Sequence, residues 1–324
     1  MNVNQTTITD FQVLGLSDNP SMKPFLFCVL LLIYVIAFLG NLTIMILYQL
    51  EKSLHIPMYF FLSNLSFLDI CYTSTTIPKM LQALVVEKKI ISFIGCIMQL
   101  YFFFACVGTE CILLGFMSYD RFVAICNPLQ YYVKMNQKVT NTMAAVSWAS
   151  GLVNSIIHTY FTFQLNFCDS NQINYFFCDI PPLLLLSCDD TLVNELLLQS
   201  IGVFIAWTPF LCIIVSYIYI IVTIIKIRST KGRQKAFSTC LSHVIVVILY
   251  YGSSISNYVR PASAHSLDKD KVISVLYSVV TPMLNPIIYT LRNQDVKRAF
   301  CKQIFNIKST CMWHSKNFLK QRTG

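Results

Sequence analysis

Charged residues are scarce in this chain of 324 residues: only 12% are Asp, Glu, Lys or Arg, while 55% are hydrophobic. Two long stretches, Phe25–Leu47 and Leu196–Ile225, contain no charged residue at all. A soluble protein interleaves charge with apolar residues to give its helices a polar face, so an ordinary soluble domain is excluded. About 20 apolar residues in a helix span the hydrocarbon core of a bilayer. The chain is therefore predicted to be an all-α membrane protein.

Five further stretches are long and apolar enough to join these two, which predicts a bundle of seven transmembrane helices. They are Ile56–Ile77, Ile97–Tyr119, Asn141–Phe163, Ala236–Val259 and Val272–Leu291. The predicted organisation is an extracellular N-terminus over residues 1–24, a seven-helix domain over 25–291 and a cytoplasmic tail over 292–324.

The tail is expected to begin with a short amphipathic eighth helix on the inner leaflet. Its apolar residues Val296, Phe300 and Ile304 recur every four positions, which places them on one helix face. Lys297, Arg298 and Lys302 lie beside them and suit the anionic lipid of that leaflet.

Basic residues concentrate on one side of the predicted bundle. With the N-terminus placed outside, the inner face holds 17 of the 24 Lys and Arg residues and only three acids, Glu51, Asp120 and Asp295. Cytoplasmic loops of membrane proteins carry an excess of Lys and Arg. We therefore expect a plasma-membrane protein with its N-terminus extracellular and its C-terminus cytoplasmic. Inner-leaflet lipid and a cytoplasmic protein are the expected partners of the basic surface, and nucleic acid is not.

The first 24 residues are polar, and no basic segment leads into an apolar one, so no cleavable signal peptide is expected. They include Asn4, which opens the triplet NQT, an acceptor sequon for N-glycosylation. The predicted orientation places this asparagine outside the cell, where glycosylation is expected.

Four of the thirteen cysteines fall in connectors predicted to face the oxidising side, where disulfides persist: Cys96, Cys168, Cys178 and Cys188. Four cysteines allow three pairings, and the spacing alone does not choose among them. No pair has zinc-finger spacing, so no structural metal site is predicted. Cysteines within the spans, such as Cys106, are expected to be small core residues.

Other classes of membrane protein find little support. No lysine lies in Val272–Leu291, which excludes a retinal Schiff base in the last span. No nucleophile-and-base set or metal motif occurs at membrane depth, so the protein is not expected to be an enzyme. The segments show no internal repeat of the kind found in many transporters. A ligand-gated channel or transporter stays as the alternative, because Asp69 and Glu110 lie within spans.

Polar residues half-way through the predicted spans form one candidate site. Asp69 and Glu110 share this depth with Asn41 and Asn285. A charge in hydrocarbon costs roughly 2.5–3.5 kcal/mol or more, so it faces the bundle interior and usually serves a function. The cluster could hold a cation such as Na⁺ or share protons. It could equally be a hydrogen-bonded node that only fixes the helix packing, and both interpretations stay open.

A series of motifs follows the predicted span boundaries. Residues 117–126, at the inner end of the third span, read MSYDRFVAIC. The others are GN at 40–41, LHIPMYFFL at 54–62, LSFLD at 65–69, KAFSTCLSH at 235–243 and PMLNPIIY at 282–289. In this order they resemble the odorant (olfactory) receptor family of rhodopsin-like G-protein-coupled receptors. The resemblance covers almost the whole chain, and it implies binding of a small volatile odorant and activation of a stimulatory heterotrimeric G protein, which raises cyclic AMP.

The resemblance also implies roles for individual residues. On activation Arg121 would separate from Asp120 and face the G protein. The residues that match the family's coupling and activation positions are Asp120, Arg121, Tyr217, His243, Asn285, Pro286 and Tyr289. Those that match its buried ion cluster are Asp69, Glu110 and Asn285. The implied disulfides are Cys96–Cys178, and Cys168–Cys188 within the second outer loop.

Some positions depart from the family pattern. Phe122 stands where tyrosine is usual, and Ile56 stands where threonine is typical. Tyr175 occupies the place of a histidine that, with Cys178 and Asp179, has been proposed as a copper or zinc motif. Without that imidazole the best ligand is missing, so no metal is predicted at this site. The one cofactor considered is Na⁺ at the mid-depth cluster.

The ligand is expected in the outer half of the bundle, where such proteins have a concave and mostly apolar site. No acid is expected to face it, which disfavours a charged amine and favours a small, neutral, largely hydrophobic molecule. Tyr258 is expected to be the main polar contact, because a phenol near the mouth of a pocket seeks a partner. The predicted ligand-binding residues are Phe103, Phe104, Val107, Gly108, His158, Ile201, Ile205, Tyr251, Ser254, Ile255, Tyr258 and Ser278, with Asn154 beside His158.

Overall fold

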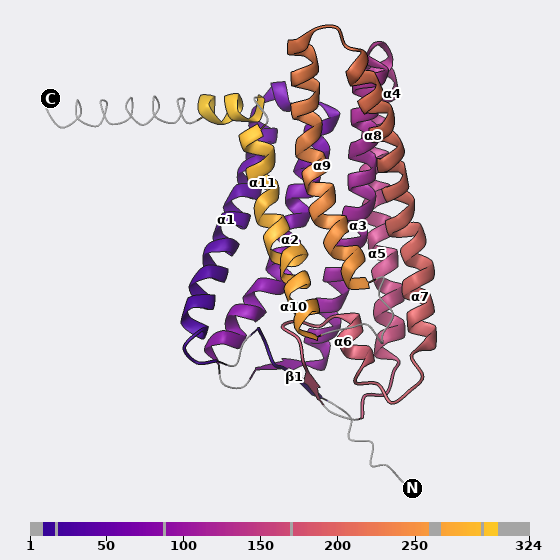
Figure 1. The fold of residues 1–324 in the computed structure, drawn as a ribbon. Helices are drawn as coiled ribbons and strands as arrows, with labels where there is room; N and C mark the ends of the chain where they lie inside the picture. The colour runs from indigo at the N-terminus through magenta and orange to yellow at the C-terminus, as the bar shows by residue number, and fades with distance from the viewer. Residues whose placement is uncertain are drawn as a thin grey trace, which may run out of the picture.

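The chain forms long helical rods packed side by side, with a small β-sheet at one end (Figure 1). The computed structural model describes residues 9–16, 19–86, 89–168, 171–258, 267–292 and 295–303. The side chains of residues 235, 257, 258, 267–270, 291 and 292 lie outside that description. The predicted Asn4 glycosylation site also lies outside the described residues.

The first half of the chain supplies four of the rods. They are α1 (Lys23–Leu50), α2 (Pro57–Val85), α3 (Phe93–Cys126) and α5 (Gln137–Phe163). Local sequence explains where they begin. The side chains of Ser92 and Asn136 accept hydrogen bonds from the backbone N–H groups of Gly95 and Val139, at 3.1 and 3.0 Å, and so cap α3 and α5. The short connectors are η1 (Lys52–Leu54), η2 (Pro128–Gln130) and α4 (Tyr131–Lys134).

The second half supplies three rods, two of which contain a π-helical turn. One consists of α7 (Leu192–Gly202), the π turn η3 (Val203–Trp207) and α8 (Thr208–Lys226). The next is α9 (Thr230–Tyr258). The last consists of α10 (Leu267–Val275), the π turn η5 (Leu276–Val280) and α11 (Thr281–Arg292). Residues 295–303 are also helical and turn away from α11 (Figure 1).

The rods make this a helical membrane protein. Within the described residues, five helical stretches are both long and apolar enough to cross a bilayer: Lys23–Leu50, Phe93–Cys126, Leu192–Lys226, Thr230–Ser256 and Lys271–Thr290. The helices α2 and α5 have 29 and 27 residues but are more polar. Most rods run beyond the predicted segments, because a helix can continue with polar residues once it leaves the hydrocarbon. The prediction of an all-α fold was correct for the bundle and wrong in leaving no place for a sheet.

The sheet joins three segments that are far apart in sequence. Strand β1 (Asp10–Val13) lies between β2 (Ile90–Ser92), to which it is antiparallel, and β3 (Gln172–Ile173), to which it is parallel. Phe11 on β1 is completely buried, and its ring packs edge-on against Phe167 at 5.5 Å between centroids. The sheet lies at the end of the bundle opposite the helical residues 295–303 (Figure 1).

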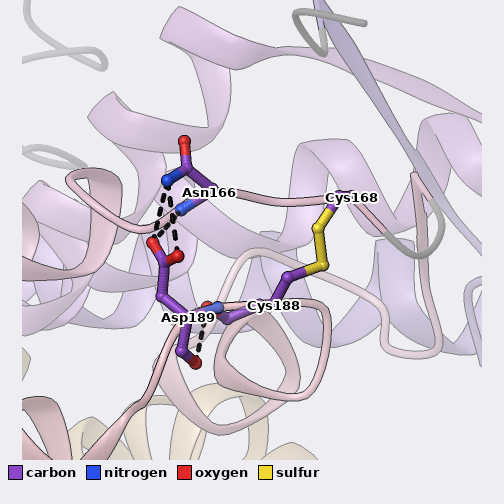
Figure 2. The surroundings of a disulfide bond; sticks show 5 residues. Asn166, Cys168, Cys188 and Asp189 are labelled. Atoms are coloured by element: carbon purple, nitrogen blue, oxygen red, sulfur yellow. Dashed lines mark hydrogen bonds between the residues drawn. A yellow bond between two sulfur atoms is a disulfide. The ribbon is translucent and has the colours of Figure 1, made fainter. Parts of the chain in front are cut away.

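The loop after α5 is tied to the bundle and to itself. Cys178 forms a disulfide with Cys96 at the start of α3, and Cys168 forms one with Cys188 within the loop. Figure 2 shows that Asn166 faces Asp189 beside the second bridge. The Asn166 backbone N–H and side-chain amide donate to Oδ2 of Asp189 at 2.8 and 3.0 Å. These are the pairs that the family resemblance implies. The short helix α6 (Ile180–Leu184) follows Cys178.

The core has two clusters, which we call outer, for the one at the end of the bundle with the sheet, and inner, for the one toward the opposite end. Aromatic residues are frequent in the outer cluster, which includes Phe11, Tyr72, Phe103, Phe177 and Tyr277. The inner one lies around α2, α3, α9 and α11 and includes Leu65, Met117, Tyr250 and Tyr289.

Close packing of α3 against α5 requires a glycine. A Cβ at Gly151 would overlap both Thr109 Oγ1 and the Ala105 carbonyl oxygen on α3. The absence of a side chain therefore lets the two helices approach closely, and together they form a tightly packed wall.

Candidate functional site

A cavity of about 290 Å³ lies among α3, α5, α7, η3 and α9. Its walls are mostly apolar, and no Asp, Glu, Lys or Arg is among the lining residues. These are Phe104, Val107, Gly108, Cys111, Asn154, His158, Leu198, Gln199, Gly202, Val203, Ile205, Ala206, Trp207, Tyr251, Ser254 and Ile255. A charged ligand would lose its hydration here without gaining a counter-charge, so the cavity suits a neutral molecule.

The wall formed by the fifth rod depends on the π turn. Its wider spacing brings Val203, Ile205, Ala206 and Trp207 to the cavity within a single stretch of the chain. The Val203 carbonyl accepts from the Thr208 backbone N–H, as a π turn requires, and also from the Thr208 hydroxyl at 3.2 Å. Periodicity for a regular helix does not predict this arrangement, so the sequence analysis missed most of this wall.

Two tyrosines tie α9 to α3 at the cavity. The Tyr250 hydroxyl donates to the Val107 carbonyl at 2.8 Å, and the Tyr251 hydroxyl donates to the Cys111 carbonyl at 2.9 Å. Both acceptor residues also line the cavity. The contact between these two helices therefore forms part of the cavity wall, so a change in the cavity can alter it directly.

The structure places eight of the predicted ligand-binding residues at the cavity: Phe104, Val107, Gly108, His158, Ile205, Tyr251, Ser254 and Ile255. Three others do not line it. Phe103 is completely buried against Tyr72 and Phe177, because consecutive residues of a helix point about 100° apart and this rotation takes its ring away from the cavity. Ser278 is buried in η5. Ile201 is half-buried on α7 and is not among the lining residues.

The side chain of Tyr258 lies outside the described residues. The expectation that it is the main polar contact therefore stays a prediction.

A second hollow of about 750 Å³ lies on the lipid-facing side of α3 and α8. It is lined by Gly115, Phe116 and Tyr119 of α3 and by Pro209, Cys212 and Val215 of α8, among others. Its walls are apolar, as expected for a surface in contact with hydrocarbon. The π turn η3 separates this hollow from the 290 Å³ cavity, since Phe204 lines the hollow while Val203 and Ile205 line the cavity.

Of the four mid-depth polar residues, Asn285 and Asp69 are in direct contact. The side-chain amide of Asn285 donates to both carboxylate oxygens of Asp69, at 3.2 and 3.0 Å. The amide of Asn41 donates instead to the Ala37 and Pro282 carbonyls at 2.9 and 3.0 Å. Three buried acceptor oxygens have no hydrogen-bond partner in the described part of the chain: Asn41 Oδ1, Glu110 Oε1 and Asn285 Oδ1. Unpartnered acceptors near a carboxylate provide ligands for a cation or for protons.

The predicted coupling residues lie at the inner end of the bundle. Arg121 has only 9% of its surface exposed, and its Nη2 has no hydrogen-bond partner among the described residues. The carboxylate of Asp120 accepts a hydrogen bond from the Tyr131 hydroxyl on α4 at 2.8 Å. Burial, followed by the neighbouring Asp120 carboxylate, raises the pKa of the Tyr131 phenol above its ordinary value. Tyr131 therefore stays protonated and keeps donating to Asp120.

Two other predicted coupling residues form a bridge between α8 and α9. The Tyr217 hydroxyl and Nδ1 of His243 are 2.8 Å apart, and the two rings stack. Tyr289 on α11 is also buried, and its hydroxyl has no partner in the described part of the chain. Asn285 and Pro286 lie one turn before it on α11. The inner ends of four rods thus meet around these side chains.

The helical residues 295–303 are anchored to the connector after α1. Lys302 Nζ and Gln303 Nε2 donate to the two carboxylate oxygens of Glu51, at 3.0 and 2.6 Å. The Lys302 hydrogen bond lowers the pKa of Glu51, although partial desolvation acts against it. Val296 is buried against the inner core cluster, whereas Phe300 is exposed, so placement of this helix on a lipid leaflet stays a prediction. Ile304 lies outside the described residues.

The fold and the site define a helical membrane protein with a ligand-sized cavity between its helices and a buried arginine at the opposite end. The family model for olfactory receptors matches residues 27–307. Mouse olfactory receptor 5AP2 is 48% identical over 305 residues, covering 94% of this chain and 96% of its own length. Human olfactory receptor 5F1 is 49% identical over 302 residues (93% and 96%), and human olfactory receptor 1F1 is 48% identical over 301 residues (93% and 96%). The chain belongs to the olfactory receptor family, a class of signalling receptors rather than enzymes.

Proposed function

We propose that the protein is an odorant receptor that binds a small, neutral, largely hydrophobic molecule in the cavity among α3, α5, α7 and α9. Binding activates a stimulatory heterotrimeric G protein and raises cyclic AMP. The observation that carries the proposal is the cavity itself, whose lining is apolar apart from a few uncharged polar groups. Its volume, at about 30 Å³ per water-sized group, accommodates roughly ten such groups, which is the size of a volatile compound.

The coupling mechanism uses the two helices that connect the cavity with the inner end. Tyr250 and Tyr251 fasten α9 to α3 at the cavity, and the inner ends of the same helices carry His243 and Arg121. A ligand shifts a receptor only through its different affinities for the two conformations. The ligand favours a state in which the inner end of α9 moves outward, so that Arg121 becomes accessible to the G-protein α subunit.

The proposed topology has seven spans in the plasma membrane, with the N-terminus extracellular and the C-terminus cytoplasmic. It rests on the basic inner connectors and on the position of the sheet and residues 295–303 at opposite ends of the bundle (Figure 1). In this topology α2 and α5 are the two more polar spans. α2 turns Leu65, Asp69 and Tyr72 into the bundle, whereas α5 exposes apolar side chains such as Val153 and Ile156. The outer loop disulfides face the oxidising side.

The mid-depth cluster supports a regulatory proposal: Na⁺ or protons bind among Asp69, Glu110 and Asn285 and favour the inactive state. The three unpartnered acceptor oxygens around it support this interpretation. We expect agonist affinity to fall as Na⁺ replaces a large organic cation at constant ionic strength, and this dependence to be lost in Glu110→Gln. Equal affinities in both salts would contradict the ion proposal and leave the receptor function unaffected.

The receptor function is tested by a panel of volatile compounds applied to cells that express the protein with a cyclic AMP reporter. At least one neutral compound is expected to raise cyclic AMP, and the response is expected to disappear in cells that lack stimulatory α subunits. An ionic current that persists in those cells would instead support the channel alternative.

A further inference from the structure

Two polar side chains of α5 point into the cavity without a partner. Asn154 and His158 are one helical turn apart, line the cavity, and have only 7% and 4% of their surface exposed. Neither makes a hydrogen bond within the part of the chain that the structure describes. Buried polar groups in folded proteins almost always have partners, so a pair that lacks them and faces a cavity indicates a ligand that supplies them.

Neighbouring residues hold the pair in place. Gly108 on α3 makes room for the Asn154 amide, because a Cβ there would lie only 3.2 Å from its Nδ2. The imidazole of His158 packs against the Phe104 ring at 5.5 Å between centroids. Because α3 and α5 form the tightly packed wall at Gly151, the backbone that carries the pair is also fixed. Both side chains are therefore oriented before a ligand binds, which reduces the entropy lost on binding.

The hydrogen-bonding capacity of the pair determines which ligand it suits. An asparagine amide has two N–H donors, and a neutral imidazole has one. A carbonyl oxygen has two lone pairs and no proton, so it can accept from both side chains at once. A hydroxyl also has a proton that needs an acceptor, so one of the two side chains must turn its oxygen or unprotonated nitrogen toward the ligand in place of an N–H. A pure hydrocarbon leaves both side chains without partners.

We propose that Asn154 and His158 form the polar subsite of the receptor, and that it selects a ligand with one carbonyl oxygen on a hydrocarbon body. Ketones, aldehydes and esters have this chemistry. The apolar remainder of the ligand lies against Val107, Ile205 and Ile255, which line the same cavity. This inference rests on the proposed function for the location of the ligand, and it names the chemical class and the residues that select it.

The test uses three probes with the same eight-carbon chain: 2-octanone, 2-octanol and octane. Binding is measured on the purified receptor in lipid nanodiscs through the fluorescence of Trp207, which lines the cavity, with Trp207→Phe as the baseline. This readout does not depend on a G protein. We expect the ketone to bind about tenfold more tightly than octane, with the alcohol between them.

The variants are Asn154→Leu and His158→Phe, which keep approximate volume and remove the donors. Each is expected to reduce the ketone-to-octane ratio to less than about threefold while octane binding is retained. His158→Gln keeps an N–H donor and is expected to restore part of the ratio. Thr159→Val on α5 is the matched control, because its buried hydroxyl also lacks a partner among the described residues but does not line the cavity. Ser254→Ala tests whether the other hydroxyl at the cavity carries the ratio instead.

The proposal is overturned if the ketone-to-octane ratio survives in both α5 variants, if Ser254→Ala removes it instead, or if the ketone does not bind up to its solubility limit. The signalling function is judged separately by cyclic AMP. A receptor that binds the ketone through Asn154 and His158 but raises no cyclic AMP would contradict the proposed function and leave the subsite in place.

Discussion

The outer and inner halves of the bundle share the same helices but treat their buried polar groups differently. In the outer half, Asn154, His158 and Ser254 face a cavity. In the inner half, Tyr131 bonds to Asp120 and Tyr217 bonds to His243, and Arg121 is almost covered. The outer half thus has a cavity that can hold a ligand. The inner half instead covers Arg121, the residue proposed to contact the G protein. Signalling then requires that ligand binding in the outer half expose Arg121 in the inner half.

The largest effect is expected from Arg121→Ala, which removes the group that the inner half conceals. Ligand-induced cyclic AMP should be abolished, because the proposed contact with the G protein is lost, while probe binding measured at Trp207 should be unchanged. Surface expression is quantified in parallel as the control. A full response at normal surface expression would show that the inner half signals without this residue.

The next largest effect concerns the wall that both halves share. In Gly151→Ala the new methyl group overlaps Thr109 and the Ala105 carbonyl on α3, so the cost should be about 1–3 kcal/mol and the melting temperature should fall by several degrees. Gly202→Ala is the matched control, because a Cβ at that position meets no atom within 4 Å. Equal melting temperatures for the two variants would mean that the α3–α5 wall is not rigid.

A smaller effect is expected at the junction of the halves. Tyr251→Phe removes the hydrogen bond from α9 to the Cys111 carbonyl and keeps the ring. Because this bond holds α9 against α3, basal cyclic AMP should rise by about two- to tenfold, the range that corresponds to one hydrogen bond. Tyr34→Phe, which loses a bond to Ser74 between α1 and α2, should leave basal activity unchanged. An unchanged basal cyclic AMP level in Tyr251→Phe would show that this hydrogen bond does not hold α9 in its inactive position.

The smallest effect concerns pH at the inner surface. The bond from Lys302 lowers the pKa of Glu51 in the folded protein, so the unfolded chain binds this proton more readily. The stabilisation is complete above the unfolded value of about 4.3 and is lost as pH falls through the folded value. The melting temperature in nanodiscs should therefore drop slightly more for the parent than for Glu51→Gln between pH 6 and 4. An identical drop in both would show that the contact contributes nothing to stability.

Hydrophobic runs predicted the helical rods, because a helix in contact with lipid needs apolar side chains. The sequence motifs predicted the family. Rod ends were less predictable: α2 continues from Ile77 to Val85 through Pro78 and Lys79, where hydropathy no longer distinguishes helix from loop. The sheet was missed because β1 has four residues and depends on two distant partners.

The candidate site was only partly predictable for similar reasons. Residues of α3 and α9 follow a regular helical face, whereas Trp207 reaches the cavity through a π turn that leaves no clear pattern in the sequence. Phe103 and Phe104 are neighbours of the same type, and which of the two faces the cavity depends on helix rotation. Rotation is set by packing against other helices, so the sequence alone could not distinguish them.

The sheet also has a consequence for biosynthesis. Strand β1 occupies residues 10–13, but its partner β3 lies at residues 172–173. The ribosome needs roughly 10–30 s to add the intervening residues at the usual rate of translation. Until then β1 can pair only with β2, and its other edge has no partner strand. A chaperone or a neighbouring chain can bind at that edge. Closure of this end is therefore a late event in the maturation of the nascent receptor.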